Sequence, residues 1–493
     1  MRICMIVEGC YPYVVGGVSS WVHKFIKSFP NEEFVLQTIV SNRNPERKVF
    51  YDLPENVTEI HELYLQDDDW QNSRRIKSKL NKREYSAVRS LVMNQDVKWE
   101  ELFDLFQNKR LSLNKLLMGE DFLHIIRDYY DEKYSQLVFT DFLWTMRSLY
   151  LPLFFTLQME IPKADLYHSV ATGYAGVLGS MGKTIYGGRL LISEHGIYTR
   201  EREEELLRAE WVQGIFKRTW IEQFRKMSNL AYEKADLVTG LYPHARALQI
   251  ELGCPPEKTL ITPNGINVES FENLPGKIDE DRGRINIGAV LRVTPIKDVK
   301  TLIQAFSFAR ERDPRLKLWI MGPWDDDKEY AKECFEQTET LGLSDDVVFT
   351  GMVDVKEYLG RMDMTILTSI SEGQPLTILE SFAARKPVIA TDVGNCAGLI
   401  LGENDDFGDA GKVVHIMNVE EIADAMVNMA NNEAMRERMG DAGYKRVNAG
   451  YRETQMNDVY FNIYKDFSRD LNLPWNEKGT EESADNKIAL AKG

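Results

Sequence analysis

Glu372 and Glu380 are the residues whose spacing is most informative about chemistry. Seven residues separate them, and a Gly-x-Pro turn follows Glu372 directly. A helical pattern follows the turn, and an apolar strand, 388–390, ends in the loop Thr-Asp-Val-Gly at 391–394. A helix N-terminus presents unpaired N–H groups and partial positive charge, which suit a phosphate. The carboxylates would repel a phosphate and instead suit hydroxyl groups, so the pattern predicts a ligand with both, a nucleotide sugar.

Two cations follow another predicted strand, at 286–291. Arg292 comes directly after this strand, and Lys297 lies five residues later. A guanidinium fork and an ammonium point charge directed at one place suit a diphosphate. The alternative is that both are solvated surface cations.

Gly16 and Gly17 follow the first predicted strand and precede a helix. Glycines permit φ > 0 and a close approach of the backbone to a ligand, although a Gly pair after a strand also makes an ordinary turn. The segment is not a GxGxxG motif, which argues against dinucleotide binding.

Two histidines lie just after predicted strands, His168 and His195. Each is a candidate site residue, and each is equally compatible with a hydrogen-bonded structural role. His195 is the stronger candidate, because a glycine and then acidic and basic residues follow it. The segment TPNGIN, 262–267, adds a tight Asn-Gly turn after another strand.

Two strings of three aspartates occur, at 67–69 and 325–327. Such strings hold a divalent metal ion against a diphosphate in some sugar transferases. Because Arg292 and Lys297 already supply positive charge, we interpret both strings as solvated acidic loops.

The order of predicted elements indicates an α/β protein with two similar halves. The chain begins strand, loop, helix, strand, and a second βα series begins after a polar segment, 272–284, which we predict to be a linker. Between the two, residues 66–160 are nearly free of glycine and show helical patterns. Ligands of such sheets bind at the carboxyl ends of the strands.

Composition excludes several classes of protein. The 493 residues are enough for two or three domains, and the formal net charge of −16 argues against a nucleic-acid binder. No signal peptide and no run of about 18 apolar residues is evident. The five cysteines are scattered without a CxxC pair, so neither a disulfide framework nor a zinc site is indicated. We expect a cytoplasmic protein.

These motifs together resemble the retaining glycosyltransferases of family GT4, which have the GT-B fold. The resemblance rests on the E-x7-E pattern, Arg292 with Lys297, TPNGIN, Gly16-Gly17 and KPVIATDVG, and it is continuous over 286–464. The first half, with VEGCYPYVVGGVSSWVH and SEHGIYTRERE, is similar to the PelF subgroup of Pel exopolysaccharide synthesis.

The resemblance implies two Rossmann-like domains with parallel sheets facing across a cleft. The first, 1–275, would bind the acceptor and carry the helical insertion, and the second, 284–451, would bind the donor. A helix at 452–471 would cross back to the first domain, and 474–493 would be a disordered tail.

The resemblance also implies roles for site residues. Arg292 and Lys297 would bind the diphosphate, Glu380 the ribose, and Glu372 the transferred sugar. His195 would lie near the anomeric centre, and Gly16 and Gly17 would approach the diphosphate and acceptor. Backbone N–H groups would hold the distal phosphate along Gln374, Pro375, Leu376 and Thr377.

The expected reaction moves a hexosyl unit from a UDP-sugar to a saccharide acceptor with retention, through front-face displacement and without a metal ion or other cofactor. An exopolysaccharide role would imply membrane-embedded synthase partners, reached at the inner face of the membrane through protein contacts. The alternatives are a non-catalytic nucleotide-sugar-binding subunit and a GT-B phosphorylase. One departure from the family is the missing acid after Gly394, since the next one is Glu403.

Overall fold

The computed structural model describes residues 1–44, 46–66, 79–108, 111–403 and 405–475. The aspartate string at 67–69 and most of the predicted disordered tail lie outside these residues. The chain forms two compact units. The first comprises Met1–Thr239, Leu248–Leu260 and the chain from Phe461 onward, and the second comprises Gly240–Ala247 and Ile261–Tyr460.

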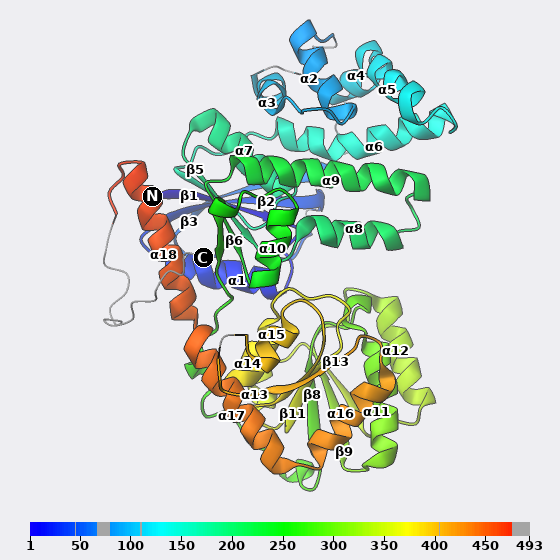
Figure 1. The fold of residues 1–493 in the computed structure, drawn as a ribbon, viewed down its shortest axis with the longest axis vertical. Helices are drawn as coiled ribbons and strands as arrows, with labels where there is room; N and C mark the ends of the chain where they lie inside the picture. The colour runs from blue at the N-terminus through cyan, green and yellow to red at the C-terminus, as the bar shows by residue number, and fades with distance from the viewer. Residues whose placement is uncertain (45, 67–78, 109–110, 404, 476–493) are drawn as a thin grey trace. The chain divides into compact units, whose positions relative to one another are not determined.

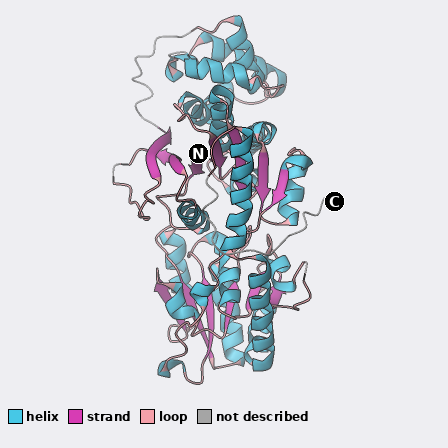
Figure 2. Cartoon of the chain, turned by 90° about the vertical axis from the view of Figure 1, so that its left-hand side faces the viewer, coloured by secondary structure: helices cyan, strands magenta, loops and turns pink. Residues whose placement is uncertain are grey.

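The first unit is built on a seven-stranded sheet with the order β3-β2-β1-β4-β5-β6-β7 (Figures 1 and 2). Parallel pairing joins β3, β2, β1, β4 and β5. The strands are β1 (Arg2–Glu8), β2 (Glu33–Asn42), β3 (Val57–Gln66), β4 (Leu166–Ser169), β5 (Arg189–Glu194), β6 (Leu237–Gly240) and β7 (Thr259–Ile261). The helices are α1 (Gly17–Ser28), α2 (Lys82–Val92), α3 (Trp99–Asn108), α4 (Leu113–Leu117), α5 (Glu120–Lys133), α6 (Phe139–Gln158), α7 (Tyr174–Tyr186), α8 (Tyr198–Arg208), α9 (Gly214–Lys234) and α10 (Pro243–Glu251).

Helices cover both faces of this sheet, because its strands are apolar on both sides (Figure 1). Strand β4 shows the alternation of side chains. Tyr167 faces α7, where a Cβ at Gly182 would meet its ring. His168 points to the opposite face, where Phe25 of α1 and Tyr464 of α18 (Glu453–Asp470) meet its ring edge-on.

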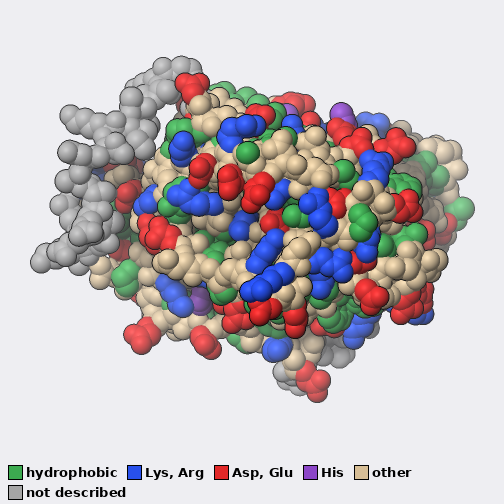
Figure 3. Space-filling view, turned by 90° about the horizontal axis from the view of Figure 1, so that it is seen from below, with side chains coloured by type: hydrophobic (Ala, Val, Ile, Leu, Met, Phe, Trp, Pro, Cys, Tyr) green, Lys and Arg blue, Asp and Glu red, His purple; other side chains and the backbone are tan. Residues whose placement is uncertain are grey.

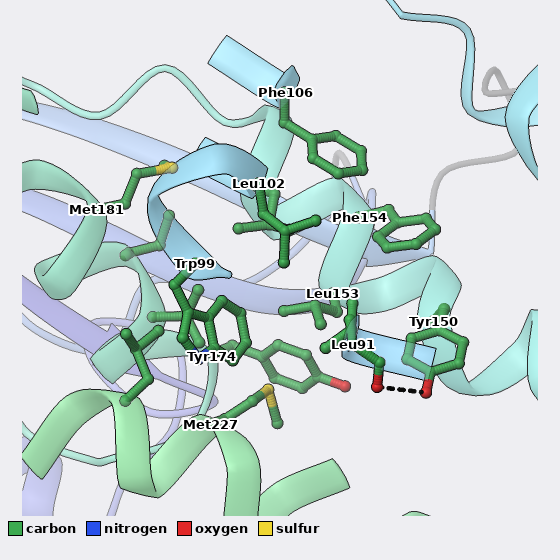
Figure 4. Close-up of a cluster of buried hydrophobic side chains, with 14 of the residues drawn as sticks. Leu91, Trp99, Leu102, Phe106, Tyr150, Leu153, Phe154, Tyr174, Met181 and Met227 are labelled. Atoms are coloured by element: carbon green, nitrogen blue, oxygen red, sulfur yellow. Dashed lines mark hydrogen bonds between the residues drawn. The ribbon is translucent and has the colours of Figure 1, made fainter. Parts of the chain in front are cut away.

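The predicted helical insertion is confirmed as α2–α6, between β3 and β4. Its buried side chains join those of the sheet in one hydrophobic cluster, which includes Ile6 of β1 and Leu102 of α3. Figure 4 shows part of this cluster, where the Tyr150 hydroxyl lies 3.4 Å from the carbonyl oxygen of Leu91. The insertion is therefore an extension of the first unit's core.

The second unit is built on a parallel six-stranded sheet with the order β10-β9-β8-β11-β12-β13 (Figure 1). The strands are β8 (Ile285–Val290), β9 (Leu316–Met321), β10 (Val347–Gly351), β11 (Met364–Leu367), β12 (Val388–Thr391) and β13 (Gly411–Val414). The helices are α11 (Val299–Arg312), α12 (Lys328–Thr340), α13 (Val355–Leu359), α14 (Leu376–Ala383), α15 (Cys396–Leu401), α16 (Val419–Ala430) and α17 (Glu433–Gly450). One buried cluster joins the sheet to α11, α12 and α16, and another joins it to α14 and α15.

Two predicted elements differ from the structure. The predicted linker 272–284 packs on the second unit, where the Arg361 guanidinium lies 2.9 Å from the buried Asp281 carboxylate. The sequence pattern predicts a long helix over about 211–235, but α9 begins only at Gly214, and the pattern did not indicate α8 before it. Most residues of α8 are charged and only a few are buried, so its sequence lacks the apolar spacing that identifies a helix.

The surface bears on the exclusion of nucleic-acid binding, and the helices bear on the exclusion of a membrane-spanning segment. On the face shown in Figure 3, basic and acidic side chains are interspersed instead of separated. This face therefore lacks the basic stripe that a nucleic-acid binder needs. Among the helices of the described residues, none is long and apolar enough to cross a membrane.

Candidate active site

The second sheet changes its winding direction between β8 and β11. Both strands lie side by side although β9 and β10 intervene in the chain, so their carboxyl ends form a topological switch point, where such sheets bind ligands. The loops that follow the two strands are tied together. Ile370 N–H donates to the Ile296 carbonyl oxygen at 2.8 Å, and the Thr368 hydroxyl donates to the Lys297 carbonyl oxygen at 3.1 Å.

Lys297 and Glu372 meet at this switch point. The Lys297 ammonium pairs with Glu372 Oε1, which also accepts a 2.5 Å hydrogen bond from the Ser369 hydroxyl. The two charged side chains are only 19% and 12% exposed. The structure thus brings together two residues that the sequence analysis singled out, and it pairs them with each other, which the sequence did not predict.

Arg292 lies in the same loop as Lys297 and pairs with the second aspartate string. Its Nη1 lies 2.8 Å from the Asp326 carboxylate, and both side chains are about two-fifths exposed. Asp327 accepts a hydrogen bond from Tyr330 N–H and caps α12. The string is thus an exposed loop, as expected, with local partners. Among the described residues, no group of three His, Cys, Asp or Glu side chains is placed to hold a metal ion.

The turn after Glu372 leads into α14. This helix has no side-chain N-cap and no acidic residue in its first turn, which contains Leu376 and Thr377. Its first turn therefore retains N–H groups for an anion. Pro375 is the N-cap residue and lacks an N–H group, so it can only orient the turn. Glu380 lies half-buried on α14, one turn after Leu376.

Gln374 contributes its side chain to the fold. Its Oε1 accepts a 2.7 Å hydrogen bond from Asn264 N–H, and its carbonyl oxygen accepts from Asn264 Nδ2 at 3.2 Å. Its Nε2 donates to the carbonyl oxygen of Leu241. The TPNGIN segment therefore anchors the turn that carries the predicted donor-binding residues.

Gly394 closes the loop against the same turn. Its φ is +54°, and Asn395 N–H donates to the Gly373 carbonyl oxygen at 2.8 Å. A Cβ at Gly394 would overlap the carbonyl oxygens of Glu372 and Gly373. A glycine is therefore required here for two reasons, the left-handed backbone and the close approach.

Substituting Gly394→Ala should destabilise the second unit and weaken nucleotide binding. The left-handed backbone alone costs an alanine about 1–2 kcal/mol, and the overlap with the Glu372 turn adds to this. Gly342→Ala is the matched control, because Gly342 has φ +66° and open space at its Cβ. Hydrogen exchange at the β12 amides and calorimetry with UDP measure the two effects. Equal losses in both variants would show that the contact with the turn is unimportant.

His195 directly follows β5 in the first unit and has a ring nitrogen available. Its Nε2 is buried and forms no hydrogen bond with the described residues, while Trp21 lies edge-on at 4.3 Å between ring centroids. Burial lowers its pKa to about 4, so the ring is neutral near pH 7. A buried nitrogen without a partner is unusual and marks a position for a ligand group.

His168 has a different environment. Its Nδ1 lies 2.7 Å from the Tyr464 hydroxyl, and its Nε2 lies 2.7 Å from the Ser193 hydroxyl. Both ring nitrogens therefore have partners within the core. This agrees with the alternative that His168 is a hydrogen-bonded structural residue. Burial lowers its pKa to about 3.

This environment predicts a pH dependence of stability. Because the folded pKa of His168 lies below the ordinary 6.5, the unfolded chain binds a proton that the folded chain rejects, and stability falls as the pH drops below 6.5. At pH 5 the loss from this residue is about 2 kcal/mol. Chemical denaturation at pH 7 and pH 5 should show a smaller loss in His168→Gln than in wild type. His415→Gln is the control, since the exposed His415 has its pKa raised by Glu421; an unchanged loss in His168→Gln would contradict the prediction.

Gly16 and Gly17 stand at the start of α1. Gly16 is the N-cap residue, with an extended φ of 178°, and neither glycine has a positive φ. The pair therefore does not use the positive φ that glycine permits. A Cβ at Gly16 would meet nothing within 4 Å, so the residue leaves open space beside an uncapped helix N-terminus.

Sequence reasoning missed two carboxylates of the first unit, the half-buried Glu8 and the buried Glu194. Glu194 is 3% exposed, directly precedes His195, and has its pKa raised by burial. It accepts hydrogen bonds from Thr172 Oγ1 (3.1 Å), Tyr198 N (3.2 Å), Tyr232 Oη (2.8 Å) and Gln249 Nε2 (3.0 Å). The available signal was that each glutamate ends an apolar strand.

Comparisons with known proteins agree with this architecture. Residues 1–257, more than half of the chain, match the family model described as "Domain of unknown function (DUF3492)", and residues 270–446 match the model described as "Glycosyl transferases group 1". The MMP alpha-(1->4)-mannosyltransferase of Mycolicibacterium hassiacum is 24% identical over 269 residues, which cover 53% of this chain and 61% of that relative. The chain therefore spans less than two-thirds of this relative's length.

Solved structures share the fold. HepE of Anabaena, in complex with UDP, matches with a TM-score of 0.59 and 14% identity over 94% of this chain and 100% of HepE. Sucrose-phosphate synthase of Thermosynechococcus elongatus matches with a TM-score of 0.62 and 16% identity over 95% and 99%. The predicted GT-B fold, with two parallel Rossmann-like sheets, is confirmed.

Proposed function

The chain belongs to the DUF3492 family, with a group 1 glycosyl transferase segment in its second half, and we propose that it is a retaining glycosyltransferase that moves a hexosyl unit from a UDP-sugar to a saccharide acceptor. The observation that carries the proposal is the meeting of Lys297 with Glu372 at the switch point of the second sheet. A cation for phosphate and a carboxylate for hydroxyl groups lie together there, beside an uncapped helix N-terminus.

Each group of the donor has a proposed partner in the second unit. Lys297 and Arg292 bind the diphosphate and stabilise the negative charge that develops as it leaves. The first turn of α14 binds the distal phosphate, Glu380 binds the ribose, and Glu372 binds the transferred sugar. Because Arg292 and Lys297 supply two positive charges, the proposal assigns no metal ion to the diphosphate.

The pairing of Lys297 with Glu372 suggests how the donor would bind, by replacing the ion pair. Without a donor, each charge neutralises the other in a half-buried position. A diphosphate offers Lys297 a stronger anionic partner, and sugar hydroxyl groups can then donate to the released Glu372 carboxylate. One ion pair thus prepares both halves of the donor site.

The proposed chemistry is a front-face displacement. The bond between the anomeric carbon and the diphosphate oxygen breaks, the acceptor oxygen bonds to the same face of that carbon, and the leaving phosphate takes the acceptor proton. His195, neutral and with Nε2 available, contacts the transferred sugar. Gly16 and Gly17 leave space for the diphosphate and acceptor. The protein supplies positioning and charge stabilisation, and no side chain forms a covalent intermediate.

The choice of UDP is supported by the complex of HepE with UDP, and the hexosyl unit by the relatives' names. We further propose a role in Pel-type exopolysaccharide synthesis, in which this cytoplasmic chain would act with membrane-embedded synthase partners at the inner face of the membrane. The resemblance of the first half to the PelF subgroup motivates this narrower assignment.

Thermal-shift screening against UDP-, GDP- and ADP-sugars tests the proposal, because a ligand that binds only the folded state raises its melting temperature. UDP-glucose or UDP-N-acetylglucosamine should give the largest shift, and incubation with the same donor should release UDP. Absence of a shift with every UDP-sugar would overturn the proposal. Binding without UDP release would instead favour a non-catalytic nucleotide-sugar-binding subunit.

A further inference from the structure

Glu8 occupies the switch point of the first sheet. It is the last residue of β1, which lies beside both β2 and β4, so its side chain stands at the carboxyl edge where the winding direction changes. Its Oε1 accepts a 2.9 Å hydrogen bond from the Tyr198 hydroxyl, and its Oε2 accepts a 3.1 Å bond from Ala175 N–H at the start of α7. Two helices therefore fix its carboxylate.

Glu8 differs from Glu194 in its remaining capacity. An ionised carboxylate offers about four lone-pair positions. Glu194 is buried and uses four donors, so its capacity is filled within the fold. Glu8 is half-buried and accepts from the Tyr198 hydroxyl and from the N–H groups of Ala175 and Tyr174, so at least one acceptor position remains.

A donor group lies next to Glu8. The Arg202 guanidinium stands over the Tyr198 ring, 5.5 Å from its centroid, and its Nε is buried without a hydrogen-bond partner among the described residues. Its Nη2 pairs with Glu205. Gly9, which directly follows Glu8, has a φ of +66°, and a Cβ there would meet nothing within 4 Å. A carboxylate with a spare acceptor position and an unsatisfied N–H donor thus lie together, beside open space.

We propose that Glu8, Tyr198 and Arg202 form a subsite for hydroxyl groups of the saccharide acceptor, with Glu8 accepting a hydrogen bond from an acceptor hydroxyl. A hydroxyl group both donates and accepts, so one hydroxyl can donate to Glu8 while a neighbouring one accepts from Arg202. A phosphate does not fit, because it would meet the Glu8 carboxylate. The inference rests on the proposed function, and the acceptor proton still goes to the leaving phosphate.

Tyr198 has a positioning role in this subsite. Its ring packs where a Cβ at Gly173 would overlap it, its N–H donates to Glu194, and its hydroxyl donates to Glu8. The ring of Tyr198 is buried and its polar groups are hydrogen-bonded, so Tyr198 can fix the orientation of the Glu8 carboxylate. Removing only its hydroxyl should loosen Glu8 and leave the ring packing intact.

The experiment compares Glu8→Gln with wild type using UDP-glucose or UDP-N-acetylglucosamine, whichever the wild type turns over. Water and two saccharide probes serve as acceptors, p-nitrophenyl β-D-glucopyranoside and p-nitrophenyl N-acetyl-β-D-glucosaminide. We expect the variant's KM for the saccharide probe to rise tenfold or more. UDP affinity and the rate of donor hydrolysis should stay within twofold of wild type. Tyr198→Phe should raise the same KM, and it replaces Glu8→Gln if that variant fails to fold.

Glu33→Gln is the matched control, because Glu33 is an exposed carboxylate at the start of β2, at the opposite edge of the same sheet. It should leave every rate unchanged. An unchanged KM for the saccharide probe in both Glu8→Gln and Tyr198→Phe overturns the subsite. A wild-type chain that hydrolyses the donor but glycosylates neither probe also overturns it. Failure of the wild type to bind UDP is a different result, because it overturns the proposed function itself.

Discussion

Lys297→Ala should reduce glycosyl transfer by about 30- to 900-fold while the fold remains intact. Losing one preorganised donor to a developing anion costs about 2–4 kcal/mol of transition-state stabilisation, and each 1.36 kcal/mol changes the rate tenfold. Lys297 is suited to this role because its ammonium is 19% exposed and stands at the switch point of the sheet. Initial rates with a UDP-sugar donor measure the effect, and the melting temperature reports on the fold.

Lys300→Ala provides the control for this prediction. Lys300 lies three residues later, pairs with Glu333 on the surface and is 41% exposed. Its loss removes the same charge from the same unit, so a purely long-range effect of charge would slow both variants equally. We expect Lys300→Ala to stay within twofold of wild type. Transfer at the wild-type rate in Lys297→Ala would remove the central residue of the proposed site.

Much of the fold could be predicted because its signals are local. The run Ile3–Val7 is apolar throughout, which is typical of a strand buried on both faces. The helices of the insertion show apolar residues at helical spacing, so the segment could be recognised as helical. Strand β3 was missed, because its polar and apolar residues do not form a buried run, and it pairs only at the edge of the sheet.

The candidate site was predictable only as far as strand ends are recognisable. Arg292, Lys297 and Glu372 were found because each follows an apolar strand. The partners of these residues were not predicted. Ser369 lies in the same loop as Glu372, and Asp326, the partner of Arg292, lies in the loop after a different strand. Pairing between loops depends on strand order, and strand order is decided by packing across the whole sheet.

The segment that follows Gly394 depends on one buried cation, Arg446 of α17. Its side chain is 2% exposed and binds both oxygens of Asp405, at 2.7 and 2.8 Å. It also donates to the carbonyl oxygens of Leu399 and Ile400 at the end of α15, and to that of Gly408. Hydrogen bonding to Arg446 holds the pKa of Asp405 below its usual range. One guanidinium therefore ties the segment after Gly394 to the domain core.

Arg446→Met should lower the stability of the second unit by about 3–5 kcal/mol, because it removes the cation that pairs with Asp405 and a donor to three carbonyl oxygens. Hydrogen exchange at the β12 and β13 amides measures this loss. Arg312→Met is the control: Arg312 pairs with Asp424 on the surface, where an ion pair contributes at most about 1 kcal/mol. The double variant Arg446→Met/Asp405→Asn should recover part of the stability, because it also removes the unpaired negative charge of Asp405.

UDP affinity should follow stability, since α15 begins directly after the Gly394 turn that packs on Glu372. A loss of stability with unchanged UDP affinity would show that this turn holds its shape without α15.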